Sequence, residues 1–189
     1  MTARKLRRLM NLWPPYLFAG IRIVAIAEDW RRAEVELRAH WWNRNYVGVH
    51  FGGSLFAMTD PFWMLLTMNV LGGEYVVWDR EGAIEFLKPG RGTVRAVFEL
   101  QDDALDEIRG ATADGQKHLH WFNADVMDGD GEIVARVRKR LYVKRKKPRD
   151  ASDTAAQGRG DTTEVRKPRS GLPNMPEPSG ADATSVRPR

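Results

Sequence analysis

The chain has no cysteine among its 189 residues. Without thiols it cannot form a disulfide framework, a cysteine nucleophile or a cysteine-based zinc or iron–sulfur site. We therefore expect a reducing, cytoplasmic setting. A long apolar run is also missing: the stretch at 48–73 is interrupted by Asp60, Pro61 and Asn69 and barely reaches the minimum length for crossing a bilayer. No membrane span is predicted.

A basic surface on the folded part is lacking as well. The formal net charge is +5, but residues 144–189 hold 11 Lys and Arg against 6 Asp and Glu, which leaves 19 against 19 in the rest of the chain. A neutral body gives no electrostatic footprint for nucleic acid, so we expect no nucleic-acid partner. Residues 148–189 are rich in Pro, Gly, Ser and charge, a composition that predicts a disordered tail.

The length and the 42% hydrophobic content predict one modest domain. We place it at residues 11–147, after a basic lead-in at 1–10. The first segment resembles a signal peptide with its cleavage site at residues 25–27. However, Pro14 and Pro15 favour the first turn of a helix, which we expect to be capped by Asn11 and followed by a strand at 21–26.

The middle of the chain reads as strands around one helix. Apolar and charged residues alternate at 33–38, which is the period of a half-buried strand. A helix is expected from Gly53 to Leu71, and because it is apolar on nearly every side it must be surrounded. Four more strands are predicted at 76–87, 93–100, 118–127 and 132–143, with a short surface helix starting at an Asp cap within 102–115.

The last two strands are joined by the turn sequence DGDG at 128–131, which lacks the later ligands of a calcium loop. Strands, then a buried helix, then four antiparallel strands predict an α+β domain of the hotdog fold. In this fold an antiparallel sheet wraps around one long central helix.

Three segments resemble hotdog-fold thioesterases of the PaaI-like kind. NRNYVGVHFGGSLFAMTD resembles the family signature, in which an Asn-containing loop leads into His-Gly-Gly and a helical Asp follows the second glycine by seven residues. Gly53 and Asp60 keep that spacing. AIEFLKPGRGTVRAVFEL resembles the next strand pair, and DGDGEIVARVRKRLYVKR resembles the closing hairpin. The resemblance covers residues 11–147 and is greatest to an uncharacterised branch similar to the C-terminal part of YiiD.

The resemblance implies an acyl-CoA thioesterase that forms a homodimer or homotetramer and needs no cofactor, since coenzyme A is part of the substrate. Asp60 would then act from the facing subunit, and Lys88 and Arg91 are candidates for binding the coenzyme A phosphates. Two positions depart from the pattern. Phe51 separates the histidine from the paired glycines, and Pro61 follows the carboxylate where the enzymes have a small residue.

Asp60 is the main candidate on physical grounds. Seven residues are almost two helical turns, so it shares a helix face with Gly53, whose turn offers free N–H groups for an oxyanion. An ionised carboxylate in an apolar helix must face a partner, water or a cleft. We expect a general base or nucleophile beside a bend at Pro61. The alternative is an ion pair with an Arg across a subunit interface, with Pro61 only shaping the packing.

Other polar residues are weaker candidates. His50 and Asn45 could orient substrate or water, or could simply be turn and capping residues. His118 and His120 would share one strand face, but without a third ligand they predict no metal site. The larger aromatic side chains are expected in the core, at an interface or lining an acyl pocket; they are Trp13, Phe18, Trp41, Trp42 and Trp63. A non-catalytic acyl-ligand binder and a hydratase remain alternative functions of the same fold.

Overall fold

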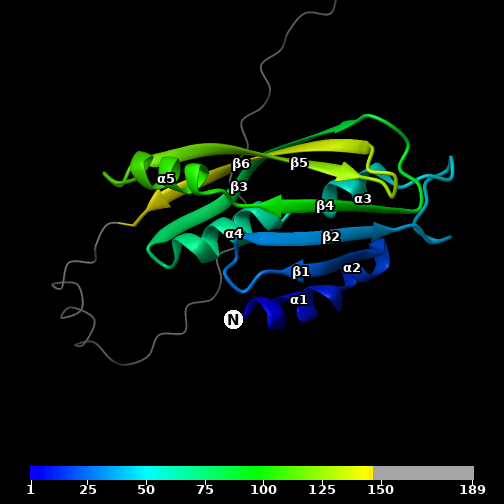
Figure 1. Cartoon of the computed structure of the whole chain (residues 1–189), viewed down its shortest axis with the longest axis horizontal. Coiled ribbons are helices and arrows are strands. Elements are labelled where there is room, and N and C mark those ends of the chain that lie inside the picture. The colour runs from blue at the N-terminus through cyan, green and yellow to red at the C-terminus, as the bar shows by residue number, and fades with distance from the viewer. Residues whose placement is uncertain (147–189) are drawn as a thin grey trace, which may run out of the picture. The chain divides into compact units, whose positions relative to one another are not determined.

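The computed structural model describes residues 1–146, and the tail predicted at 148–189 lies outside the described residues (Figure 1). Its elements are, in order, α1 (Ala3–Asn11), α2 (Pro14–Ala19), β1 (Ile21–Ile26), β2 (Arg32–Arg38), α3 (Gly52–Ala57), α4 (Phe62–Leu71), β3 (Tyr75–Phe86), β4 (Thr93–Glu99), α5 (Asp102–Ala111), β5 (Lys117–Met127) and β6 (Ile133–Arg145). No helix in this part of the chain is long and apolar enough to cross a membrane.

The strands form one antiparallel sheet in the order β1-β2-β4-β5-β6-β3. The predicted turn at 128–131 joins β5 to β6, and Asp128 caps it by accepting hydrogen bonds from the backbone N–H groups of Asp130 and Glu132. The α5 helix begins at Asp102 as expected, but Gln101 occupies its N-cap position without a side-chain hydrogen bond. The predicted α+β class is confirmed.

The core lies between α4 and the sheet. Two rings of α4 stack on rings of the sheet: Phe62 on Phe98 at 4.8 Å and Trp63 on Phe122 at 4.5 Å between centroids. Offset aromatic pairs of this kind add to the free energy gained by burying their area. Alternate residues of β4, β5 and β6 face this core.

The central helix differs from the prediction, because it is split into α3 and α4 by a turn at 58–61. Pro61 has no N–H to donate to the carbonyl of Ala57, so the helical ladder cannot continue through this point. Asp60 therefore lies in the turn between two helices.

The N-terminal segment also differs from the prediction. Residues 3–11, expected only as a basic lead-in, form α1, which packs beside β1 (Figure 1). Asn11 does not cap the proline-led helix, whose N-cap is Trp13. Instead, the Asn11 side chain accepts a hydrogen bond from Ile23 N at 2.7 Å and donates to Ile23 O at 3.0 Å. It therefore occupies the backbone groups at the outer edge of β1.

Candidate active site

The turn between α3 and α4 places Asp60 at the surface of a pocket. Pro61 has no N–H to donate to the carbonyl oxygen of Ala57. This oxygen instead accepts hydrogen bonds from Asp60 N at 3.2 Å and from the Tyr16 hydroxyl at 3.3 Å. The interrupted ladder is thus satisfied by the turn itself and by a side chain of α2. This arrangement ties α2 to the turn that carries the carboxylate.

The pocket has a volume of about 320 Å³ and is walled mainly by apolar groups. Its lining combines α2 and the segment before it with α3 and the following turn: Trp13, Pro15, Tyr16, Gly53, Phe56, Ala57, Asp60 and Pro61. Gly53 and Asp60 therefore meet in one pocket, although the helix between them is not continuous. The side chain of Asp60 is 57% exposed, so its charge faces solvent and the pocket.

Lys139 of β6 is the partner of Asp60. Its side chain is only 5% exposed, and its Nζ lies 2.6 Å from Asp60 Oδ1 and 3.5 Å from Asp79 Oδ2. The ring of Phe56 covers the ammonium group at 5.4 Å. The predicted alternative for Asp60 was an ion pair with an Arg across a subunit interface; within the chain, the paired cation is Lys139.

Asp79 and Tyr16 complete the electrostatics of the site. Burial raises the pKa of Asp79 and the charge of Asp60 adds to this, while Lys139 opposes it. Burial, followed by the charge of Asp60, raises the pKa of Tyr16 well above its usual range. The Tyr16 phenol therefore remains protonated and acts as a hydrogen-bond donor. The exposed carboxylate of Asp60 and the neutral donor Tyr16 thus line the pocket, and the buried cation of Lys139 contacts the carboxylate.

Aromatic rings occupy the space beside the paired glycines. A Cβ atom on Gly53 would lie 2.4 Å from the Phe51 ring, and one on Gly52 would lie 2.8 Å from the Phe86 ring. Both rings are more than half exposed, so they are not fixed by core packing. The first turn of α3 can be approached from the pocket at Gly53, and the Phe51 ring borders that approach.

His50 and Asn45 lie outside this pocket. His50 is buried, its Nε2 is 2.9 Å from Gly92 O, and burial lowers its pKa. Asn45 Oδ1 accepts hydrogen bonds from the backbone N–H groups of Val47 and Val49, both at 3.1 Å. These contacts fit the turn and capping interpretation of both residues.

The two candidates for binding phosphate are in different surroundings. Lys88 makes ion pairs with Asp128, at 2.6 Å, and with Glu132, so its charge is already compensated within the chain. Arg91 is exposed and lines a separate cavity of about 100 Å³ together with His50. Of the two, Arg91 offers the more accessible cation.

The five aromatic residues expected in the core, at an interface or in an acyl pocket lie in different environments. Trp63 lies in the core and Trp13 lines the pocket. The other three members, Phe18, Trp41 and Trp42, are at least half exposed.

Sequence reasoning missed the groups that surround Asp60, although a signal existed. In β6 the positions facing the core are Ala135, Val137, Lys139, Leu141 and Val143, so a lysine interrupts an otherwise apolar alternation. Asp79 likewise follows Tyr75 and Val77 at two-residue steps on β3. A charged residue at an inward position needs a partner, and this requirement could have linked both residues to Asp60.

Comparisons with known proteins agree with this architecture. The chain superposes on a protein of unknown function from Pseudomonas aeruginosa, named as a probable thioesterase, with a TM-score of 0.68 at 16% identity, covering 77% of this chain and 97% of that one. A thioesterase from Haemophilus influenzae gives 0.56 at 18% identity, with 77% and 92% covered. A mutant thioesterase from Pseudomonas aeruginosa gives 0.56 at 14% identity, with 75% and 93% covered.

At these identities the likeness shows the fold alone, and the chain has the hotdog fold of these proteins. A search of curated proteins found no match. Residues 2–143 match a family described as Domain of unknown function (DUF4442), and the chain belongs to that family.

Proposed function

We propose that this protein hydrolyses an acyl thioester such as an acyl-CoA, with Asp60 as the general base or nucleophile. The observation that carries the proposal is the exposed Asp60 carboxylate, held in a largely apolar pocket by the buried ammonium of Lys139 at 2.6 Å. A carboxylate held in one orientation next to an apolar cavity suits attack on an acyl group that occupies the cavity.

In the proposed reaction, the acyl chain lies against Trp13, Phe56 and Pro61, and its carbonyl faces the first turn of α3 at Gly53. Asp60 accepts a proton from water while the water oxygen bonds to the carbonyl carbon. The C–S bond then breaks, and the departing thiolate takes up the proton. In direct attack, a carboxylate oxygen of Asp60 would instead bond to the carbonyl carbon as the C–S bond breaks and the thiolate leaves, and water would then hydrolyse the resulting anhydride to the free acid and Asp60. Backbone N–H groups near Gly53 would stabilise the oxyanion.

The proposal includes a homodimer, in which the site is shared between subunits. Two features support it. The outer edge of β1 is occupied by Asn11, whereas no strand of residues 1–146 pairs with the outer edge of β3. In addition, several large apolar side chains between β2 and α3 are more than half exposed, which favours a covering partner: Trp41, Trp42, Tyr46, Val47 and Phe51.

Arg91 is the proposed contact for a coenzyme A phosphate, because it is exposed while Lys88 is already paired with two carboxylates. The chain needs no further cofactor in this scheme. A cytoplasmic location, proposed from the lack of cysteine, would supply acyl-CoA substrates.

A non-catalytic acyl-ligand binder is the second candidate. It is favoured by the positions of His50 and Asn45, which are used in a turn and do not line the Asp60 pocket. A pocket with a single exposed carboxylate has fewer groups to position water than a site with several.

The Asp60→Asn variant tests the proposal and makes the first prediction. It keeps the shape and much of the hydrogen bonding but removes the proton acceptor, so hydrolysis of acyl-CoA esters of graded chain length should fall by about 100-fold or more. The matched control is Asp125→Asn, which breaks an exposed ion pair with Arg136 at 2.8 Å and should leave turnover unchanged.

Unchanged hydrolysis by a well-folded Asp60→Asn protein would remove Asp60 from the catalytic step. Lack of hydrolysis by the wild-type protein, together with saturable binding of an acyl-CoA measured calorimetrically, would favour the acyl-ligand binder.

A further inference from the structure

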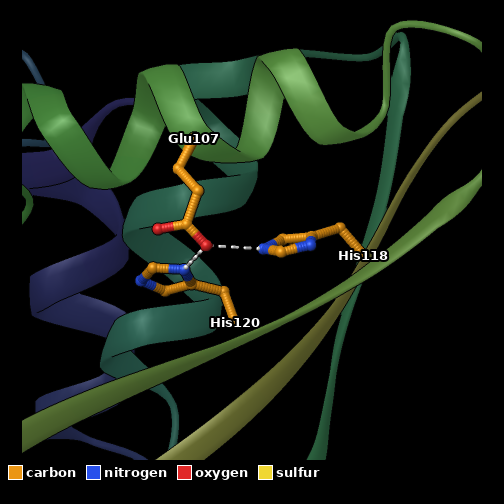
Figure 2. A group of neighbouring side chains, drawn as sticks. All are labelled: Glu107, His118 and His120. Atoms are coloured by element: carbon orange, nitrogen blue, oxygen red, sulfur yellow. Dashed lines mark hydrogen bonds and ion pairs between the residues drawn. The ribbon is translucent and has the colours of Figure 1, made fainter.

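Three potential metal ligands meet where α5 packs on β5, as Figure 2 shows. Glu107 projects from α5 towards His118 and His120 on the strand. Its Oε1 lies 3.0 Å from His118 Nε2 and 3.2 Å from His120 Nδ1, and the three ligand atoms lie within 4.8 Å of one another. All three donor atoms thus surround one small volume.

The strand and the helix bring these residues together for separate reasons. Side chains two apart on a strand share a face, so both histidines lie on the side of β5 that carries Phe122. The α5 helix is fixed against this face by buried Leu105 and Ile108, which leaves Glu107 beside the imidazoles. The ligand that appeared to be missing from the sequence is therefore supplied by a helix that precedes the strand.

The three side chains are held close together before an ion binds. The His118 and His120 side chains are mostly buried, and the His120 ring packs on Phe122 with 4.5 Å between centroids. Little side-chain freedom would be lost on binding. Two ligands about 2.1 Å from a tetrahedral zinc ion lie roughly 3.4 Å apart, which is close to the separations between the carboxylate oxygen and each ring nitrogen.

We propose that Glu107, His118 and His120 form a binding site for a divalent transition-metal ion of the zinc type. Two imidazole nitrogens and one carboxylate oxygen suit Zn²⁺ and Co²⁺ better than Mg²⁺ or Ca²⁺, which prefer oxygen ligands alone. Three protein ligands leave one position open to water on the side where Glu107 is exposed. None of the three residues lines the Asp60 pocket, so this site is independent of the proposed hydrolysis.

The test uses the untagged full-length protein after treatment with EDTA and dialysis. Calorimetric titration with ZnCl₂ should show one ion bound per chain, and Co²⁺ should give a visible absorption band that Zn²⁺ abolishes. Because the ion binds the folded chain, the melting temperature should rise by about 5–10 °C when free Zn²⁺ reaches about 100 times its dissociation constant.

The variants His118→Ala and His120→Ala should each weaken Zn²⁺ binding by about 100-fold or more and abolish the Co²⁺ band. Both positions are partly exposed, and circular dichroism checks that the variants fold. His40→Ala is the matched histidine control, because His40 stacks on Trp42 in another part of the chain. Asp106→Asn is the matched control on α5, since Asp106 pairs with Arg109. Both controls should bind like the wild type.

Two results would overturn the proposal. In the first, about 100 μM Zn²⁺ produces no heat of binding and no change in melting temperature, and Co²⁺ gives no absorption band. This concentration is far above the dissociation constant expected of a preorganised three-ligand site. The other is binding that His118→Ala and His120→Ala leave intact. In either case, the cluster would be only a hydrogen-bonded link between α5 and β5.

Discussion

Lys139 is nearly buried, yet both of its carboxylate partners come from distant parts of the sequence. Asp60 precedes it by 79 positions, and Asp79 lies on the neighbouring strand β3. Taking an ammonium group out of water is costly unless opposite charges accompany it. The lysine therefore depends on the two aspartates, and their positions depend on the lysine. The same cation that compensates a buried charge also fixes the orientation of the proposed catalytic carboxylate.

Lys139→Met is the second prediction. Replacing the cation leaves Asp79 partly buried without its compensating charge, so the free energy of unfolding at neutral pH should fall by about 1–3 kcal/mol. The double variant Lys139→Met/Asp79→Asn should recover most of this loss, which urea unfolding measures. A double variant as unstable as the single one would show that packing of the lysine stem, and not charge, dominates.

The pH dependence of stability gives a third prediction for Asp79. Its pKa is raised above the usual value of 3.8 in the fold, so the folded chain binds this proton more tightly than the unfolded chain. The contribution of Asp79 to stability is therefore full below pH 3.8 and is lost as the pH rises through the raised pKa. Asp79→Asn should lack this loss.

The measurement is the difference in unfolding free energy between wild type and Asp79→Asn from about pH 4 to pH 8, since other titrating groups cancel in that difference. The unfolding free energy of the variant should increase relative to that of the wild type as the pH rises. A difference that is constant with pH would contradict the raised pKa.

At the scale of elements, the break between α3 and α4 determines where the carboxylate points. Pro61 ends the helical hydrogen-bond ladder, and the Tyr16 hydroxyl donates a hydrogen bond to the carbonyl oxygen of Ala57, which Pro61 cannot reach with an N–H. In an uninterrupted helix, the Asp60 side chain would lie on the helix surface beside the residues one turn before and after it. The turn instead lets it reach both the pocket and Lys139.

Pro61→Ala is the fourth prediction. An alanine N–H can bond to the carbonyl oxygen of Ala57, so the two helices should join and draw Asp60 away from the pocket. Thioester hydrolysis should fall by about 10-fold or more with little loss of thermal stability. Pro14→Ala is the control, because a proline in the first turn of α2 replaces an N–H that has no helical partner. Full activity in Pro61→Ala would show that the break is not needed for hydrolysis.

Local patterns explain which elements were predictable. The strand at 21–26 was predicted with its observed bounds, and the alternation at 33–38 identified buried Ala33, Val35 and Leu37 correctly. The interrupted helix was only partly predicted: the bend at Pro61 was expected, but two separate helices were not. The interrupted alternation at Lys139 and Asp79 indicates that each charge needs a partner, but spacing alone does not identify it, because register between strands and the contact with Tyr16 are set by tertiary packing. For the same reason, the contact of Glu107 with His118 and His120 could not be predicted from the sequence.

At the scale of the whole molecule, the sheet has two different edges. At the β1 edge, Asn11 binds both backbone groups of Ile23, and Arg7 donates to Val24 O at 2.8 Å. At the β3 edge, a strand of 12 residues has no neighbouring strand among residues 1–146. A long unpaired edge is the usual place for strand addition.

The fifth prediction is a dimer that forms through β3. Light scattering at micromolar concentration should give twice the chain mass. Hydrogen exchange should show amides of β3 whose protection increases with protein concentration, whereas amides of β1 should not respond. A monomer at all concentrations, or protection at β1 in place of β3, would contradict a shared site built on this edge.

The side chain of Asn11 has a consequence for how far assembly can proceed. A sheet with two open edges can add copies without end, and its growth is limited only by concentration. A sheet with one edge closed by an amide has only one edge on which another copy can pair. Once two copies have paired through it, no open edge is left, and the assembly has a finite size. One asparagine at the end of α1 would thus keep this chain from polymerising into fibres.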